Sequence, residues 1–317
     1  MRHSVGILFA AILALGLTTS HAHADDALRV GKAVAGPFDF VPLDVGLAKG
    51  FFKAHGIVVE EVDFDGSAKL QQGLGADAVD VGLGSGPELA FVAKGNTDLA
   101  IAVFAGPPNS QVLVVRKDGS VHSIADLKGK NIGLSTVGSL TDWLLRTLSR
   151  QQGWGPDGIN GVALGSESGR TASLRASSTD GMIIDVATAA QLVKEGTGNV
   201  IVHFGTVAPD FIIHAIFATN KAIAGRPEVL KRFLVGWFET INWMRAHKDE
   251  TVAIAAPVMH QAPDIVAMNY DQTMNDFSTT GRFEPKALAV LAQSFVEMKT
   301  LPAAPDMSKL YTEKLLP

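Results

Sequence analysis

The 317-residue sequence contains no cysteine, and this absence excludes several kinds of chemistry. Disulfides, thiolate metal ligands and cysteine nucleophiles all require a thiol. Lipid anchoring through a cysteine at the start of an exported domain is excluded as well. The fold must therefore be stabilised by its hydrophobic core, and a chain of this length can bury enough surface for that.

The sequence also lacks an excess of positive charge. It has 27 Lys and Arg against 32 Asp and Glu, which gives a formal net charge of −5. Nucleic acid is therefore not an expected partner, because binding to a phosphate backbone depends on basic residues. With 47% hydrophobic and 19% charged residues, the composition is typical of a packed globular protein.

Long apolar runs are scarce, and the one that stands out lies at the N-terminus. Arg2 precedes an apolar run over residues 5–17, and Ala22-His23-Ala24 follows with small residues at the two outer positions. This pattern is typical of a secretory signal peptide. A spanning helix needs roughly 20 apolar residues, so a retained anchor is the less favoured interpretation. We expect cleavage after Ala24 and export of a soluble protein to the periplasm.

Sequence motifs for catalysis, metals and cofactors are missing too. The nine histidines show no metal-ligand spacing, and residues 82–86 are glycine-rich but lack the lysine of a phosphate loop. No Gly-x-Ser-x-Gly motif is present, and residues 166–169 form a polar loop rather than a nucleophile motif. The sequence therefore predicts no catalytic residue, no metal and no cofactor.

Residues 28–118 alternate between strand and helix patterns, with a first helix expected over residues 42–55. Such alternation predicts a mostly parallel sheet covered by helices. Ligands of such sheets bind beyond the carboxyl ends of the strands. Here those ends are loops of small residues, at 35–38, 65–67, 84–87 and 105–108.

The β/α pattern repeats over residues 117–210, a long apolar strand is expected over 211–219, and the remainder is mostly helical. We predict an α/β fold of two lobes, each a mostly parallel sheet with flanking helices, joined by two hinge crossings near 114–116 and 216–219. The expected boundaries are 1–24 for the signal peptide, 25–115 with 216–317 for lobe 1, and 116–215 for lobe 2. Two lobes joined in this way can close on a ligand.

Three segments carry a resemblance to a known family: LAKGFFKAHGIVVEEVDF, LGADAVDVGLGS and SIADLKGKNIGLS. With the signal peptide, they resemble the solute-binding proteins of bacterial ABC importers, in particular the aliphatic sulfonate, taurine, nitrate and thiamine-precursor (NMT1/THI5-like) group. The resemblance implies a type II-like periplasmic binding protein fold, a small-molecule ligand, and a permease and ATPase complex as partners of a monomer. Residues 177–187 lack the aromatic residue and the proline that are usual in the family at this position.

Several strand ends offer donors for an anion. Ser135, Gly138, Ser139 and Thr141 surround a predicted helix N-terminus, where free N–H groups and the helix dipole favour negative charge. Simple helix capping is the alternative interpretation. The same reasoning applies to three residues on the opposing lobe, namely Ser67, Ser85 and Gly86.

Other candidates are weaker. Phe38 could wall in a ligand, although ordinary packing is the favoured interpretation. Asn109 lies beside a hinge strand and could bond a ligand head group, and Asp185 ends a strand of the second lobe. Asp39 and Glu88 could select an amine, although solvated surface charge is the favoured interpretation. Arg170 is interpreted as a surface residue, although it is close enough to a strand end to reach an anion. His214 is interpreted as a core histidine.

We therefore expect an exported protein, not an enzyme, that captures a small anionic organic solute (sulfonate-, carboxylate- or nitrate-like) between two lobes for an ABC importer. One alternative is a ligand-sensing receptor of the same fold that docks on a membrane sensor. Another is an enzyme resembling the pyrimidine synthases, which the absent cysteine and the signal peptide oppose. The predicted ligand contacts are Phe38, Asp39, Ser67, Ser85, Gly86, Asn109, Ser135, Gly138, Ser139, Thr141 and Asp185.

Overall fold

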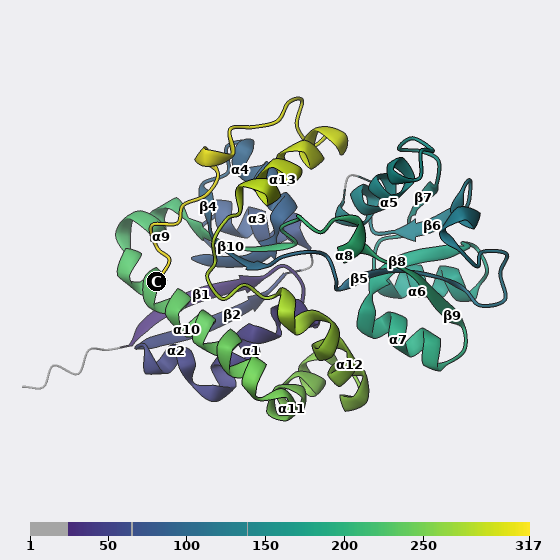
Figure 1. Cartoon of the computed structure of the whole chain (residues 1–317). Helices are drawn as coiled ribbons and strands as arrows, with labels where there is room; N and C mark the ends of the chain where they lie inside the picture. Colours follow the sequence, from purple (N-terminus) through teal and green to yellow (C-terminus); the bar gives the residue numbers. More distant parts are fainter. Residues whose placement is uncertain (1–24, 65, 138) are drawn as a thin grey trace, which may run out of the picture.

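The computed structural model describes residues 25–64, 66–137 and 139–317. The predicted signal peptide and Gly138 lie outside the described residues. Two five-stranded sheets form the centres of two lobes, which lie side by side in Figure 1. The predicted two-lobed α/β fold is confirmed.

The first sheet has the strand order β2-β1-β3-β10-β4. Its strands are β1 (Asp26–Lys32), β2 (Ile57–Asp63), β3 (Val81–Ser85), β4 (Asp98–Ala105) and β10 (His214–Thr219). Strand β1 pairs in parallel with β2 and β3, whereas β10 runs antiparallel between β3 and β4. The sheet is mostly parallel, with the late strand β10 inserted near one edge.

The second sheet repeats this arrangement with the order β7-β6-β8-β5-β9. Its strands are β5 (Gln111–Arg116), β6 (Asn131–Leu134), β7 (Asn160–Ala163), β8 (Gly181–Asp185) and β9 (Gly198–His203). Strand β6 pairs in parallel with β7 and β8, and β5 runs antiparallel between β8 and β9. Each sheet thus has one antiparallel strand, and that strand is the first after a crossing between the lobes.

The crossings differ from the prediction. Strand β5 pairs wholly within the second sheet, so the first crossing lies over residues 106–110 rather than near 114–116. The second lies over 204–213, and β10 starts at His214 rather than at residue 211. A buried apolar strand has the same residue pattern in either sheet. The sequence therefore could not show that β4 belongs to the first sheet and β5 to the second. From this pairing we place the lobe boundaries in the two crossings.

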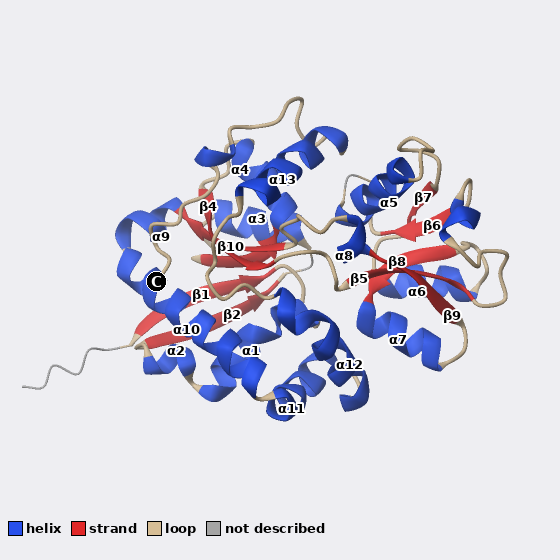
Figure 2. Ribbon diagram, viewed as in Figure 1, coloured by secondary structure: helices blue, strands red, loops and turns tan. Residues whose placement is uncertain are grey.

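Helices flank both sheets (Figure 2). Around the first sheet lie α1 (Val41–Lys49), α2 (Phe51–Ala54), α3 (Ser67–Gly75), α4 (Leu89–Ala93), α9 (Asn220–Gly225), α10 (Pro227–Ala246), α11 (Lys248–Met259), α12 (Pro263–Thr273) and α13 (Pro285–Glu297). The second sheet carries α5 (Leu140–Gln151), α6 (Glu167–Arg175) and α7 (Val186–Lys194), and α8 (Phe204–Val207) lies in the second crossing. Short 3-10 helices are η1 (Phe38–Phe40), η2 (Gly86–Glu88), η3 (Ile124–Leu127), η4 (Met274–Asp276) and η5 (Met307–Lys309).

Glycine and proline set the helix ends. Gly50 has a φ of 77°, a left-handed conformation that interrupts the helix expected over residues 42–55 and divides it into α1 and α2. Pro227, Pro263 and Pro285 each begin a helix, where a missing backbone N–H costs nothing.

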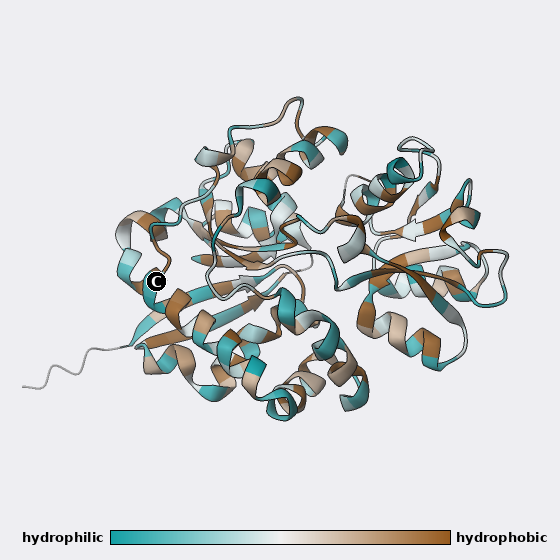
Figure 3. Cartoon of the chain, viewed as in Figure 1, coloured by the Kyte–Doolittle hydropathy of each residue, from teal (hydrophilic) through white to brown (hydrophobic). Residues whose placement is uncertain are grey.

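The core is apolar and includes the strands of both sheets. The central strands are buried, and β5 and β8 are coloured largely as hydrophobic in Figure 3. The largest fully buried side chain among the described residues is Trp237, which packs edge-on against Phe104 with ring centroids 5.3 Å apart. No helix within residues 25–64, 66–137 and 139–317 is long and apolar enough to cross a membrane.

Candidate functional site

A cavity of about 660 Å³ lies between the two lobes. Its volume falls within the range of small-molecule sites. Loops that follow β1, β2, β6, β7 and β8 form most of its walls, as expected for carboxyl ends of parallel strands. The lining residues are Val34, Ala35, Gly36, Pro37, Gly66, Ser135, Thr136, Gly165, Ser166, Glu167, Arg170, Asp185, Ala187, Thr188, Met259 and Gln261. We call this cavity the cleft.

The wall of the cleft on the first lobe is mostly apolar. Residues 34–37 follow β1, and Gly66 precedes α3. Met259 and Gln261 come from the junction of α11 with α12, where His260 adopts a φ of 53°. This junction could not be singled out from the sequence, because its helices are far from the strand ends in the chain.

Arg170 is the one guanidinium in the described lining of the cleft. It lies in the first turns of α6 and is only 5% exposed. Its Nη1 donates to the carbonyl oxygen of Gly165 at 2.6 Å, and its Nη2 lies 3.6 Å from Glu167 Oε1. Its Nε has no hydrogen-bond partner among the described residues. The predicted surface role of Arg170 is wrong, since packing of α6 on the second sheet turns the side chain inward.

Burial alters the ionisation of Arg170 without removing its charge. Desolvation lowers the pKa of its guanidinium, and the neighbouring Glu167 acts in the opposite direction. An arginine stays protonated throughout the physiological range. The buried, partly unpaired guanidinium is therefore suited to a bidentate contact with an oxyanion.

Asp185 ends β8 and caps α7 on the same wall. Its Oδ1 accepts hydrogen bonds from the backbone N–H groups of Ala187 at 2.8 Å and Thr188 at 3.3 Å. Burial, followed by the charges of Glu167 and Asp39, raises the pKa of the Asp185 carboxyl to about 8. A mostly neutral carboxyl therefore lines the cleft at pH 7.

The predicted hydroxyl cluster after β6 is present but largely self-satisfied. Ser135 Oγ donates to Ser139 Oγ at 2.9 Å and lies 3.0 Å from Thr141 Oγ1. Ser139 also caps α5 by accepting from the N–H of Asp142 at 3.4 Å. Ser135 lines the cleft, whereas Ser139 and Thr141 stand behind it. Gly138 lies outside the described residues, so its predicted contact stays a prediction.

The three predicted donors on the first lobe point elsewhere. Glu88 is 1% exposed, and its carboxylate accepts from the backbone N–H of Ser85 at 2.7 Å and from Gln71 Nε2 at 2.9 Å. The hydroxyl groups of Ser67 and Ser85 bond to the same carboxylate. Glu88 is therefore a buried acceptor, not the solvated charge or amine selector that the sequence suggested. Gly86 is buried against Ile212 in the second crossing.

Phe38 and Asp39 lie behind the cleft. Phe38 is 1% exposed and packs edge-on against Tyr270 and Phe277, with ring centroids 6.1 and 6.2 Å apart. Asp39 is 6% exposed and its Oδ2 lies 3.3 Å from His214 Nε2. Phe38 is a core residue. Asp39 affects the cleft through its negative charge, which helps to raise the pKa of Asp185.

His214 is held in the core, as predicted. Its ring stacks on Phe104 with centroids 5.2 Å apart, and its Nδ1 lies 3.2 Å from the carbonyl oxygen of Gly84. Both ring nitrogens thus face acceptors, the Gly84 carbonyl and the Asp39 carboxylate. His214 therefore links the first sheet to the acidic groups behind the cleft.

Asn109 ties the first crossing to the first lobe. Its Nδ2 donates to Asp276 Oδ1 at 2.6 Å, and the other carboxylate oxygen, Oδ2, is buried without a hydrogen-bond partner among the described residues. Burial and the charge of Asp39 raise the pKa of Asp276 to about 6, while the bond from Asn109 opposes this shift. Asn109 lies in the first crossing and is not among the described residues that line the cleft.

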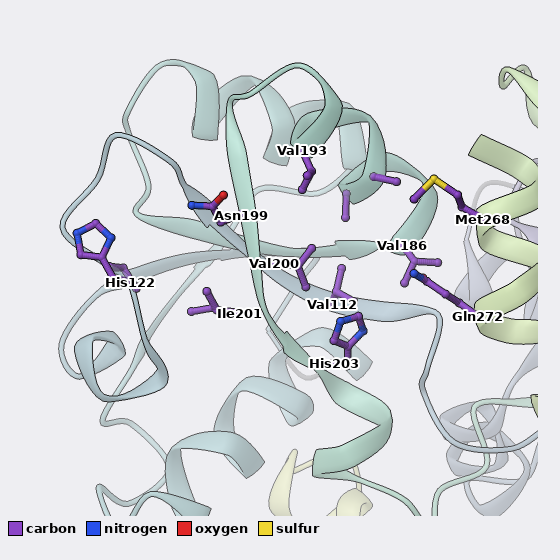
Figure 4. Close-up of a pocket in the computed structure, with 13 residues that line it drawn as sticks. Val112, His122, Val186, Val193, Asn199, Val200, Ile201, His203, Met268 and Gln272 are labelled. Atoms are coloured by element: carbon purple, nitrogen blue, oxygen red, sulfur yellow. The ribbon is translucent and has the colours of Figure 1, made fainter. Parts of the chain in front are cut away.

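A second cavity, of about 610 Å³, lies along the edge strand β9 between α7 and α12. Figure 4 shows Met268 and Gln272 reaching from α12 toward Val186 and Val112 of the second lobe. Its described lining is mainly aliphatic and has no carboxylate or guanidinium. The cleft, which has both, is the better candidate for binding a polar solute. No group of three His, Asp or Glu side chains within the described ranges is placed to hold a metal ion.

Comparison with known families decides the assignment. The family model described as NMT1/THI5 like matches residues 37–251. The chain belongs to the NMT1/THI5-like family. The resemblance noted in the sequence is thereby confirmed. No curated protein matches the sequence.

Solved structures share the fold of this NMT1/THI5-like protein. The periplasmic aliphatic sulphonate binding protein SsuA from Escherichia coli has a TM-score of 0.79 at 17% identity, with 90% of this chain and 92% of that chain covered. The alkanesulfonate-binding protein SsuA from Xanthomonas axonopodis pv. citri, bound to MOPS, has 0.75 at 16%, with 90% and 98% covered. The desulfurization enzyme DSZB has 0.67 at 16%, with 92% and 97% covered.

At such low identities, these structural similarities establish the fold of periplasmic binding proteins and nothing finer. The fold is used by binding proteins and, in DSZB, by an enzyme. The function of this NMT1/THI5-like chain must therefore be argued from its own cleft.

Proposed function

We propose that this protein is an exported solute-binding protein that captures a small organic acid in the cleft and delivers it to an ABC importer. The ligand would be a sulfonate or carboxylate, or a nitrate-like anion. The proposed location is the periplasm, after removal of residues 1–24. The named functions of the SsuA relatives support this class of ligand.

Arg170 is the observation that carries the proposal. A buried guanidinium that lines a cavity of small-molecule size, with one backbone carbonyl and a carboxylate 3.6 Å away as its partners, is costly to keep unless an anion adds to its hydrogen bonds. Thr136 lies on the same wall and offers a hydroxyl group to a ligand, whereas the Ser135 hydroxyl already donates to Ser139. An oxyanion bound at Arg170 would also lie near the N-terminus of α6, where the helix dipole favours negative charge.

Closure of the lobes is the proposed mechanism. The cleft draws residues from both lobes, and the lobes are joined by only two crossings. A ligand that contacts both walls stabilises the closed state because those contacts exist only there. No bond is made or broken in this scheme.

An enzymatic role has less support. A hydrolase would need a nucleophile activated by a neighbouring base. The Ser135 hydroxyl bonds to the hydroxyl groups of Ser139 and Thr141 and not to a base, and no histidine is among the described residues that line the cavity. The absence of cysteine excludes a thiol mechanism.

A thermal-shift screen with sulfonates, carboxylates and nitrate, followed by calorimetry, tests the proposal. A ligand at 100 times its dissociation constant adds roughly 2.7 kcal/mol of stability. Arg170→Gln should weaken binding by about 10- to 100-fold, because a charged hydrogen-bonding group contributes roughly 1.5–3 kcal/mol.

Arg175→Gln is the matched control. Arg175 lies on the same helix but is 51% exposed at its side chain and pairs with Glu195. The Arg175→Gln variant should bind the ligand with the same affinity as the unmodified protein. Equal loss in both variants, or no stabilisation by any compound, would contradict the proposal.

A further inference from the structure

The second cavity, which runs along β9, is a binding site in its own right by size and lining. Its volume of about 610 Å³ falls within the range of small-molecule sites. None of its described lining residues also lines the cleft. It combines an apolar lining with a few neutral polar groups, which is the usual composition of such sites.

Helix α7 stands between this cavity and the cleft. The cavity is lined by an apolar stripe of the helix with the spacing i, i+3, i+4 and i+7, namely Val186, Ala189, Ala190 and Val193. Ala187 and Thr188, which line the cleft, lie on another side of the same helix. The two sites therefore share α7 as a wall but do not share side chains.

Apolar side chains are left exposed on both walls of the second cavity. Val193 of α7 is 45% exposed and Met268 of α12 is 48% exposed, and both are large hydrophobic residues. Figure 4 shows Met268 extending from α12 of the first lobe toward the second lobe, which carries Val193. Removal of such apolar surface from water is favourable. A molecule that covers both side chains therefore contacts both lobes.

The polar groups of the cavity select for an uncharged occupant. Asn199, His203 and Gln272 are exposed, and their side chains have no hydrogen-bond partner within the described ranges. They can bond to a hydroxyl, carbonyl or amide group. The described lining has no carboxylate, ammonium or guanidinium group. An ion buried there would lose water without gaining a counter-charge, which is costly.

We propose that the second cavity binds a neutral, mainly apolar small molecule that holds the two lobes together. The occupant contacts α12 of the first lobe and α7 of the second, so it stabilises the arrangement in which these helices are close. The ion pair between Lys194 and Asp264 spans the same two helices. The inference goes beyond the proposed function, because it concerns another cavity and another ligand chemistry. Occupancy acts on lobe closure without a contact in the cleft, which makes the cavity a regulatory site.

N-phenyl-1-naphthylamine, a neutral apolar dye whose fluorescence rises in apolar surroundings, tests the inference on the purified protein. Its titration should saturate. Val193→Glu and Met268→Lys should each weaken binding at least tenfold, because the new charge loses water when the dye binds. Leu47→Glu is the matched control, since Leu47 is 38% exposed on α1 and does not line the cavity. It should keep the affinity within about twofold, as expected for a surface change distant from the dye.

Small-angle scattering tests the effect on the lobes. Saturating dye should raise the fraction of compact molecules in the unmodified protein and in Leu47→Glu, but not in Met268→Lys. Equal melting temperatures of the three variants without dye would confirm that each is folded.

Four results would overturn the inference. One is a titration that does not saturate, and another is an equal loss of affinity in Leu47→Glu, which would indicate general binding to exposed apolar surface. The third is binding without compaction, or binding that Met268→Lys leaves intact, because the dye would then not bridge the lobes. The fourth is self-association in size-exclusion chromatography that Val193→Glu and Met268→Lys abolish, because a second copy would then cover the cavity. The anion screen tests the proposed function separately, so either proposal can fail while the other stands.

Discussion

A carboxylate at the N-terminus of a helix is ordinarily stabilised in its charged form, because the helix dipole and free N–H groups favour the anion. Asp185 has both of these partners, yet the pKa of its carboxyl is raised to about 8. Burial is the largest cause, and the charges of Glu167 and Asp39 add to it. Two backbone hydrogen bonds do not offset the loss of water and the neighbouring negative charge.

The stability of the ligand-free protein should therefore depend on pH through Asp185. The carboxyl binds its proton more tightly when folded than when unfolded, where its pKa is about 4. Its contribution to stability is full below about pH 4, declines as the pH rises, and is lost above about pH 8. Denaturant melts should show a fall of at least about 1 kcal/mol between pH 6 and pH 9, because a tenfold difference in proton affinity between the folded and unfolded protein corresponds to about 1.4 kcal/mol.

Asp185→Asn should flatten this dependence. Asparagine keeps the capping oxygen for Ala187 and Thr188 but cannot ionise. Asp118→Asn, at a side chain that is 83% exposed, should leave the slope as it is. An equal slope in all three proteins would rule out the assigned ionisation.

Single residues also mark the limit of sequence reasoning. Ser67 and Ser85 were expected to face a ligand because they precede helices after strands. Glu88, which lies further along the chain, instead turns inward and takes both hydroxyl groups. The sequence favours a surface position for Arg170. It could not show otherwise, because only the packing of α6 decides whether a side chain in the first turns of this helix faces water or the cleft.

Among the elements, the second crossing packs closely against the first lobe. Gly86 donates its N–H to the carbonyl oxygen of Ile213 at 2.9 Å. A Cβ atom at Gly86 would lie 2.0 Å from the carbonyl oxygen of Ile212. Backbone, not a flexible side chain, is the obstacle, so the position requires glycine for close approach and not for an unusual φ.

Gly86→Ala should therefore destabilise the protein by about 1–3 kcal/mol, because overpacking forces the backbone to shift. The melting temperature should fall by several degrees in a thermal scan. Gly225→Ala is the control, since a Cβ there meets nothing within 4 Å and its φ is not positive. That variant should melt at or slightly above the temperature of the unmodified protein. A neutral Gly86→Ala would show that the crossing can move away from η2.

The sequence was informative about elements whose ends are set locally. Pro227, Pro263 and Pro285 begin helices in the region that the sequence predicts to be mostly helical, and Ser123 forms a capping box at the start of η3. The sequence was uninformative about the partner of β5, because pairing depends on strands 65 or more residues further along the chain.

At the scale of the whole molecule, contacts between the lobes extend beyond the cleft. Lys194 of α7 pairs with Asp264 of α12 at 2.7 Å, close to Gln191 and Gln261 at the rim. Farther from the rim, Glu297 of α13 accepts from Trp143 Nε1 at 2.8 Å and from Arg150 at 2.6 Å, both on α5. Each of these contacts would be lost or strained if the lobes moved apart at that side.

Lys194→Glu should therefore weaken ligand binding about two- to fivefold, the effect expected for an exposed ion pair that forms only on closure. Small-angle scattering should show a smaller fraction of compact molecules at a given ligand concentration. Lys231→Glu removes an exposed bridge to Glu228 within a single helix and should leave the affinity as it is. If both substitutions act equally, net charge and not closure is the cause.

The insertion of β10 between β3 and β4 has a consequence for the order in which the protein folds. The strands of the second sheet, β5 to β9, are continuous in the chain, so that sheet can assemble as soon as residue 203 has been synthesised. The first sheet begins at residue 26 but cannot join β3 to β4 until β10 arrives. Pairings over such long separations form slowly because a large loop must close first. The lobe made first should therefore finish folding last, and its exposed strand edges need protection until then.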